Sequence, residues 1–592
     1  MRTKILSTLA VAVLAVGAAA AVPLTASAAE DCRTIPVNAD SELTSDIARA
    51  DFGVDGTGIK VGIISGSFNL VDTGSTWEQN IAQGLLPGEG NPCGWTTPVV
   101  RLSEPDTNVV PASLITDEGR AMAQVVHGIA PGAELFYAEG VGQGLAQAIQ
   151  QLRGAGVDII VDDLIAADET VYQVSAQTAA IEEAVASGVT YLTAAGNNTL
   201  VSLERRRTGN ELVPIGNWET VAYRPAPCDP SVKVTVTAPF TGYDCMDFDA
   251  TEGVRTVSSL VTVPAELAEP ETVAQPTVIM QWAEPDGAAK AAFSIVATGG
   301  TADGTVIASD PTYPAAAGRI SINVPPIVRD DLPANEVTVG LSIVRMTTGT
   351  PETDITPALR LVFPTDGPQW IASSDEVASN ELDTVGRSIV GHNAAPSALT
   401  VAATGAGDEG QLEQFSSLGP ASPVYFDVTG APVADPRTIS KPTILSVDGI
   451  EQNALTEGEE IQPGVWLFNG TSAATPSAGA VAALALQLNP ALTPAELGRL
   501  IEQSTTPDRS IYPSIADRDA VGSGLVNAQA LLTAVQATLP APQPGEAPPR
   551  PTLAASGLTD GGTAVPLGLV LLTLGLAVVV TVRVRRKTGD TR

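Results

Sequence analysis

The sequence is poor in the side chains that most metal sites need. Its 592 residues include two histidines and four cysteines, and no Cys-x-x-Cys occurs. Structural zinc sites take four Cys or His ligands at short spacings, so zinc chemistry is not expected here. The sequence also implies no organic cofactor.

Basic residues are scarce as well. Lys and Arg total 31 against 66 Asp and Glu, which gives a net charge of −35. The stretch between residues 30 and 557 holds 24 basic and 64 acidic residues. So acidic a surface repels phosphate backbones, which excludes nucleic acid as a partner of the folded part. Wholesale disorder is excluded too, because 44% of the residues are hydrophobic.

The N-terminus has the pattern of a signal peptide. Two basic residues precede an apolar run from Ile5 to Ala21, and the small residues Ala26-Ser27-Ala28 follow as a cleavage site. A transmembrane anchor fits worse, because Pro23 follows the run so soon. Residues 1–28 are therefore predicted to direct export.

The C-terminal segment, residues 553–592, predicts attachment to the cell surface. Ala564 to Val582 is free of charge and long enough to span a bilayer, and basic residues that should stay cytoplasmic follow it. Just upstream, Leu553 to Gly557 reads LAASG and resembles the LAxTG variant of Gram-positive cell-wall sorting signals. A plain membrane anchor and processing by sortase are both compatible with this order.

Export decides how the four cysteines are interpreted, because an oxidising compartment favours disulfides. Cys228 and Cys245 would close a short loop, which leaves Cys32 and Cys93 as the other pair. The sequence alone allows three connectivities.

Strands and helices alternate along the first part of the mature chain. The pattern predicts strands at 58–68, from 133, from 157 and from 189, with helices at 117–126, 145–153 and 176–187. This alternation predicts a parallel sheet with helices on both faces, whose ligands bind at the carboxyl ends of the strands.

The helical period disappears between residues 228 and 368. Short β-rich runs separated by Gly, Pro and Asp turns replace it, beginning with VKVTVTAP at 232–239, which predicts an antiparallel β-sandwich. The parallel-type pattern returns from Ser388, and the final helix is expected to begin at Thr493, with a capping box and Pro494 at its first position.

These patterns divide the chain into six segments. We predict a signal peptide (1–28), the first part of an α/β domain (29–227), an inserted β-sandwich (228–368), the second part of the α/β domain (369–538), a Pro-rich stalk (539–552) and the sorting motif, membrane helix and basic tail (553–592).

The most specific motif is NGTSAATP, from Asn469 to Pro476. A serine in the first turn of a helix lies near amide donors that stabilise developing negative charge. The segment resembles the nucleophile motif GTSxxxP of subtilases and sedolisins, and Ser472 stands at its serine. The resemblance implies a subtilisin-like α/β fold and hydrolysis of peptide bonds through an acyl-enzyme.

Other segments resemble this family in the expected order, over roughly residues 50–225 and 385–508. AAGNN matches the strand end at which subtilases place an oxyanion-hole amide, which implies that role for Asn197. Calcium is common in the family, although no ligand set can be assigned in this sequence.

The catalytic base departs from the subtilase pattern. Where HGTHVAG is expected the chain reads DEGRAMA, which puts Glu118 at the position of the catalytic histidine, as in sedolisins. In those enzymes a carboxylate is the base and a second acid shares its proton. We interpret His127 as structural and His392 as a residue of a turn or a pocket wall.

The supporting acid is not where the family places it. Met122 stands at the sedolisin position, and Gly66 stands where a subtilase has its strand-exit aspartate. We expect Asp162 or Asp163, at the exit of the strand from 157, to replace it, although Asp162 could equally be a helix cap or a groove acid. Glu118 itself could be either a base or a dipole partner at a helix start.

The sequence therefore predicts an exported, surface-anchored serine peptidase that acts on peptides or proteins. Its principal rival is a degenerate peptidase scaffold that binds rather than cleaves, which the loss of the aspartate at Gly66 and of the histidine favours. A third hypothesis is a lectin-like adhesin that binds through the sandwich, for which Trp282 and the predicted location are the only support.

Overall fold

A computed structural model describes the chain from residue 32 to residue 540, with gaps. The described residues are 32–71, 74–165, 169–199, 214, 217–230, 232–249, 259–264, 277–299, 306–309, 318–323, 336–362, 379–407, 411–456 and 458–540.

A seven-stranded sheet forms the centre of the first part and the second part of the chain. Its order is β18-β17-β5-β4-β1-β3-β2, and every neighbouring pair is parallel. The strands are Lys60–Ser65 (β1), Val100–Arg101 (β2), Glu134–Glu139 (β3), Ile159–Asp162 (β4), Thr190–Ala194 (β5), Leu399–Gly405 (β17) and Ile444–Asp448 (β18).

Helices cover both faces of this sheet because its strands alternate apolar side chains between two cores. Ile159 and Val161 of β4 enter the core that includes α4 and α8, whereas Ile160 enters the core with α5 and α6. These four helices are Glu118–Ile129 (α4), Leu145–Ala155 (α5), Ala176–Ala186 (α6) and Thr471–Leu488 (α8). The predicted doubly covered parallel sheet is confirmed.

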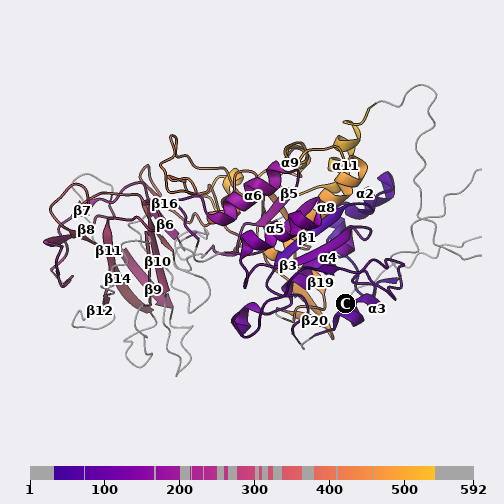
Figure 1. Cartoon of the computed structure of the whole chain (residues 1–592), viewed down its shortest axis with the longest axis horizontal. Helices are drawn as coiled ribbons and strands as arrows, with labels where there is room; N and C mark the ends of the chain where they lie inside the picture. The colour runs from indigo at the N-terminus through magenta and orange to yellow at the C-terminus, as the bar shows by residue number, and fades with distance from the viewer. Residues whose placement is uncertain are drawn as a thin grey trace, which may run out of the picture. The chain divides into compact units, whose positions relative to one another are not determined.

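Both ends of the described chain contribute to the same layered unit. Strand β5 pairs directly with β17, so the sheet is complete only when the second part of the chain is present. Figure 1 shows this as purple elements such as α5 and β1 interleaved with the orange α8 and the yellow-orange α11. The remaining helices of this unit are Asp40–Leu43 (α1), Ser45–Phe52 (α2), Trp77–Ala82 (α3), Ala112–Leu114 (η3), Gly391–Ala394 (η6), Pro494–Gln503 (α9), Asp517–Val521 (α10) and Ala528–Gln536 (α11).

A short antiparallel sheet precedes α8. It has the order β19-β21-β20, and its strands are Ile450–Gln452 (β19), Glu460–Gln462 (β20) and Val465–Phe468 (β21). It therefore leads the chain from the end of β18 to the start of α8.

Two antiparallel sheets form the insert and pack on each other. One has the order β13-β10-β15-β6-β16 and the other β12-β11-β14-β8-β7, with β9 also paired to β14. The rings of Trp282 and Phe293 bring the sheets together at 5.2 Å between centroids. The strands are Asn217–Thr220 (β6), Pro225–Ala226 (β7), Gly242–Met246 (β8), Ser259–Pro264 (β9), Thr277–Trp282 (β10), Ala292–Gly299 (β11), Val306–Ser309 (β12), Arg319–Asn323 (β13), Glu336–Thr347 (β14), Leu359–Val362 (β15) and Asp383–Val385 (β16).

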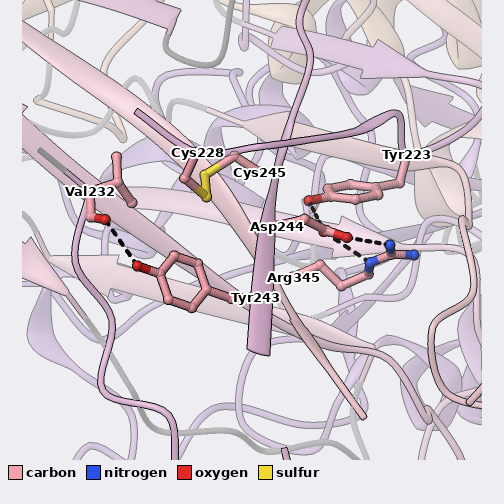
Figure 2. The surroundings of a disulfide bond; sticks show 7 residues. All are labelled: Tyr223, Cys228, Val232, Tyr243, Asp244, Cys245 and Arg345. Carbon is pink, nitrogen blue, oxygen red and sulfur yellow. Dashed lines mark hydrogen bonds and ion pairs between the residues drawn. A yellow bond between two sulfur atoms is a disulfide. The ribbon is translucent and has the colours of Figure 1, made fainter. Parts of the chain in front are cut away.

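Two disulfides join Cys32 to Cys93 and Cys228 to Cys245, as predicted. Figure 2 shows the second bond on β8, next to the ion pair between Arg345 and Asp244 at 2.6 Å. The disulfide ties the start of the insert to β8, and the partly buried charge pair ties β8 to the central strand β14.

Two local predictions were wrong. The run VKVTVTAP, at 232–239, forms no strand, because Val232 and Val234 pack against the disulfide while the other residues of the run are exposed and pair with no neighbouring strand. The helix that begins after Thr493 has the predicted capping box, but it is not the final one, because α10 and α11 follow.

Several predicted segments lie outside the described residues. These are the signal peptide at 1–28, the part of the stalk beyond residue 540, the motif from Leu553 to Gly557 and the apolar run at 564–582. Among the residues that the structure describes, none of the helices has the length and apolar character needed to cross a membrane.

Candidate functional site

Three parallel strands end, and two helices begin, at one edge of the large sheet. Strands β1, β4 and β5 end at Ser65, Asp162 and Ala194, while α4 begins at Glu118 and α8 at Thr471. Helix α8 packs against α4, β4 and β5. This arrangement, which we call the polar edge, gathers the residues singled out from the sequence.

Ser472 lies in the first turn of α8 and is 9% exposed. The preceding Gly470 has φ +99°, a conformation that favours glycine, and its amide donates to Asp448 at 2.7 Å. The first turn of α8 thus starts from a fixed backbone, and the serine lies at the positive end of the helix dipole.

Asn197 follows β5 and is fixed by the residue before the serine. Its Oδ1 accepts hydrogen bonds from both the amide and the hydroxyl of Thr471, each at 3.0 Å. Because these contacts occupy the oxygen, the side-chain nitrogen is left as the donor. The structure therefore holds Asn197 against Thr471, the residue before Ser472, which the motif alone could not establish.

Glu118 and Asp163 form a pair of carboxyl groups at the polar edge. Their side chains are hydrogen-bonding neighbours. Ser65 Oγ donates to Asp163 Oδ2 at 2.9 Å, whereas no donor of the described residues reaches the buried Oδ1. Because two carboxylates repel each other, the contact requires a proton shared between them.

The electrostatics of Asp163 agree with a shared proton. Burial, and next the charge of Glu118, raise the pKa of Asp163 well above its usual value, with Asp162 adding to the effect. The hydrogen bond from Ser65 acts in the opposite direction but does not outweigh them. Asp163 therefore keeps a proton at a pH where an exposed aspartate has lost it.

Asp162 lies on the opposite face of the sheet. Successive residues of a strand point to opposite faces, so Asp162 shares the side of Ile160 and α5. Its Oδ1 lies 3.4 Å from Nε2 of His392. Of the two aspartates proposed from the sequence, the structure brings only Asp163 to Glu118.

The positions at which the family keeps its acids are closed in this chain. A Cβ added to Gly66 would lie 2.6 Å from the carbonyl oxygen of Leu114, so the loop before α4 leaves no room for a side chain. Met122 is fully buried in the core. Asp117 is engaged by Ser67 Oγ at 2.9 Å and by Arg120 at 2.9 Å, away from the Glu118 and Asp163 pair.

His127 is structural in its surroundings, as we interpreted it. It is 1% exposed near the C-terminal end of α4. Burial, and next the charge of Arg33, lower the pKa of His127 well below its usual value despite a hydrogen bond with the Pro131 backbone. It is therefore a neutral imidazole about 13 Å along the helix from residue 118, at 1.5 Å per residue.

Within the described ranges, no group of three His, Cys, Asp or Glu residues is arranged to hold a metal ion. The side chains present at the polar edge are a hydroxyl, an amide and paired carboxyls. These groups suit proton transfer and stabilisation of an oxyanion.

Sequence reasoning missed Ser65 and Thr471, which hold Asp163 and Asn197 in place. Strand alternation could have separated Asp163 from Asp162, because Val161, which shares the face of Asp163, lies on the side of the small-residue helix α8. Nothing in the sequence indicates that the backbone of Leu114 leaves no room for a side chain at position 66.

Comparison with known proteins bears on this geometry. The subtilase family model matches residues 377–529, which include β17, β18 and α8. No curated protein matches the chain. The solved CspB protease of Clostridium perfringens is 12% identical, with a TM-score of 0.47 over 84% of this chain and 99% of that one.

Two further solved structures cover similar lengths. MycP1 from Mycobacterium smegmatis is 14% identical, with a TM-score of 0.34 over 88% of this chain and 89% of that one. The prenylagaramide maturation protease PagA is 14% identical, with a TM-score of 0.34 over 84% of this chain and 97% of that one. The architecture is subtilisin-like with inserted antiparallel sheets, and residues 377–529 resemble the subtilase family, whose model they match.

Proposed function

We propose that the chain is a serine peptidase that cleaves peptide bonds through an acyl-enzyme on Ser472. The observation that carries the proposal is the carboxyl pair of Glu118 and Asp163, at the sheet edge where Asn197 is fixed beside the start of α8. A subtilase fold with a carboxyl pair in place of histidine has the parts that nucleophilic catalysis needs.

Each residue has one chemical role in this proposal. Ser472 Oγ attacks the carbonyl carbon of the peptide bond and gives its proton to Glu118. Asp163, in its protonated form, donates a hydrogen bond to the Glu118 carboxylate and keeps that base oriented. The Asn197 amide donates to the oxyanion, and Glu118 then returns the proton to the leaving amine.

The carboxyl pair predicts activity on the acid side of neutrality. The reaction needs one proton in the pair, so activity falls when the pH rises past the raised pKa of Asp163. It falls again at low pH, when the second carboxyl also becomes protonated. A histidine-based subtilase would instead lose activity on the acid side as its imidazole becomes protonated.

Labelling of the full-length chain by a fluorophosphonate, from about pH 3 to pH 8, tests the proposal. We expect labelling that grows toward acid and is lost in Ser472→Ala. Ser477→Ala is the matched control, since Ser477 is a buried serine of the same helix whose hydroxyl bonds to Val447 O at 3.0 Å. Absence of labelling and of peptide cleavage at every pH would contradict the proposal.

The second candidate is a binding scaffold that has lost catalysis. The closure of position 66 by Leu114 favours it, because the strand-exit acid of subtilases has no room there. The same labelling series separates the two functions. A scaffold would bind peptides without being labelled, and its Ser472→Ala variant would bind them equally well.

We also propose that the protein is exported and attached to the cell surface by residues 553–592, through the membrane or through sortase. The apolar run at 564–582 and the LAASG motif support this. Fractionation tests it. Deletion of 553–592 should release the protein into the medium, and Gly557→Ala should change its fraction only if sortase acts on the motif.

A further inference from the structure

A second polar cluster lies behind the polar edge, on the opposite face of the sheet. It is centred on His392 and Asn393 of the short helix η6, which are 0% and 4% exposed. Neither residue belongs to the proposed catalytic set. Such a buried polar cluster costs free energy unless its members are paired, so its contacts are informative.

Both ring nitrogens of His392 face hydrogen-bond acceptors. Nδ1 lies 2.7 Å from Glu169 Oε2, and Nε2 lies 3.0 Å from the carbonyl oxygen of Leu164. Neither acceptor can donate, since one is a backbone carbonyl and the other belongs to a carboxylate that already accepts from Ser175. Nδ2 of Asn393 also lies 3.2 Å from Nε2, but its hydrogens already bond to two backbone carbonyl oxygens. The ring therefore donates from both nitrogens, which requires a doubly protonated imidazolium.

Asn393 joins the same loop to the neighbouring strand. Its Nδ2 donates to Leu164 O at 3.1 Å and to Ala194 O at 2.9 Å. Leu164 follows Asp163, and Ala194 ends β5, three residues before Asn197. Helix η6 therefore connects the segments that carry the supporting acid and the amide donor.

The far end of this loop is held by the insert. Gln281 of β10 donates to Glu169 O at 3.1 Å and accepts from the Val171 amide at 2.9 Å. Gly391 allows the close approach of η6, because a Cβ there would lie 2.6 Å from Glu169 Oε2. The insert, the loop after β4 and η6 thus share one buried residue, Glu169.

We propose that His392 is a positioning residue for the reaction at Ser472: from behind the sheet it fixes the loop that begins at Asp163 and neutralises Asp162 beside it. The inference rests on the proposed function for its catalytic consequence. Its structural content, a buried imidazolium that links η6 to the loop after β4, can be tested without any activity.

The charged groups that face His392 are Glu169, from the loop before α6, and Asp162, from β4. Burial lowers the pKa of His392, but the carboxylates of Glu169 and Asp162 outweigh it and raise that pKa to about 10. Tyr191 of β5 also faces Asp162, and burial raises the pKa of its hydroxyl well above the usual value, so it stays neutral. The imidazolium therefore persists across the pH range of the proposed activity.

The chain has two histidines, which makes the experiment direct. The full-length protein is labelled with ¹⁵N in histidine, and the two imidazoles are followed from about pH 5 to about pH 8. The variants are His392→Gln, Glu169→Gln and the matched control His127→Gln. His127 is also buried but neutral, so its loss changes packing without removing a charge.

We expect one imidazole to stay protonated on both nitrogens up to pH 8, and to be the one that His392→Gln removes. Fluorophosphonate labelling of His392→Gln should be about 10- to 100-fold slower than that of His127→Gln. In His392→Gln, the loss of labelling on the basic side of the pH profile should move to higher pH. The reason is that the charge of Asp162, no longer compensated, disfavours ionisation of the Glu118 and Asp163 pair. Glu169→Gln, which keeps His392 and Asp162 but releases the loop, should slow labelling without that movement.

The outcomes separate this inference from the proposed function. A neutral His392 at pH 7 in the wild type overturns the inference, and so do equal labelling rates and pH profiles in His392→Gln and His127→Gln. Absence of labelling in the wild type contradicts the peptidase, while the ¹⁵N result still decides whether the imidazolium exists. If His392→Gln does not fold, the wild-type titration and the Glu169→Gln variant decide the matter.

Discussion

Two adjacent aspartates at the end of β4 have opposite surroundings. Asp163 faces α4 and α8, where it meets another acid, Glu118, and keeps a proton. Asp162 faces α5 and α6, where it lies 3.4 Å from the imidazole of His392. Because successive strand residues point to opposite faces, these neighbours have different roles: the carboxyl of Asp163 is suited to proton transfer, and that of Asp162 is part of an ion pair.

The comparison shows how two adjacent residues of one strand end can serve different purposes. Asp163 belongs to a carboxyl pair that shares a proton, whereas Asp162 belongs to an ion pair. The backbone fixes both side chains, and each face of the sheet gives its aspartate a different partner. The two groups should therefore respond differently to the same chemical change, from aspartate to asparagine.

The largest expected effect is on the reaction itself. Asp163→Asn and Glu118→Gln should each lower the rate of fluorophosphonate labelling by about 10²–10⁴-fold at the pH optimum, because each removes the shared proton or the base. Asp162→Asn should lower it far less. The double variant of 118 and 163 should be no worse than either single one, since the two act as a unit. Equal losses in Asp162→Asn and Asp163→Asn would break the comparison.

The next largest effect is expected on stability, from the ion pair between Glu169 and His392. Glu169→Gln should lower the free energy of unfolding by about 3–5 kcal/mol, because it leaves His392 charged and buried. Opposing burial, the charge of His392 lowers the pKa of Glu169 below 4.5. The pKa of His392 is raised from 6.5 to about 10.

The pH dependence of that loss follows from the two shifts. The pair's stabilisation is complete between about pH 4.5 and 6.5, is lost as the pH falls through the lowered pKa of Glu169, and is lost as the pH rises toward 10. Chemical denaturation at several pH values measures it. Glu183→Gln, which removes an exposed partner of Arg153, should cost less than about 1 kcal/mol at any pH.

A smaller effect on the free energy of unfolding is expected at Gly66, where subtilases have an aspartate. Gly66→Ala should destabilise the fold by about 1–3 kcal/mol, because its Cβ meets the backbone oxygen of Leu114. Gly154→Ala, in α5 with open space around it, should instead stabilise by about 0.4–1 kcal/mol. Thermal unfolding of the two variants checks this. A neutral Gly66→Ala would show that the loop before α4 can move, and that an acid could be accommodated there.

The smallest expected effect sharpens the contrast between the aspartates. Since the pKa of Asp163 is raised, unfolding releases its proton once the pH exceeds about 3.8, so this group destabilises the fold as the pH rises. Asn cannot ionise, and Asp163→Asn should melt above the wild type at pH 7 but not near pH 3. Asp162→Asn should melt below the wild type at pH 7, because it weakens the pair with His392.

The parallel sheet, the sandwich and the Cys228–Cys245 disulfide could be predicted because they follow from short-range patterns, and the Cys32–Cys93 disulfide followed as the remaining pair. Short apolar runs between helical segments located β1, β4 and β5, and the capping box located the start of α9. The motif around Ser472 indicated the resemblance to subtilases. The sequence offered both Asp162 and Asp163 as the partner of Glu118 and did not choose between them, because the contact depends on how α4 packs against the exit of β4.

The cluster around His392 was missed for the same reason. Its members, Asp162, Glu169, Gln281 and His392, come from four separate stretches of the sequence, and no spacing relates them. An isolated histidine in a small-residue segment carries no sign of its charge state. Only the acceptors on both sides of the ring reveal it.

The order in which the sheet is completed has a consequence for synthesis. Strand β5 borders β17, and the insert is translated between them. A nascent chain that has emerged only as far as the insert has β5 as an unpaired edge and has no α8. The hydroxyl at 472 arrives after every other member of the polar edge, so the proposed active site is complete only after the second part of the chain has been translated.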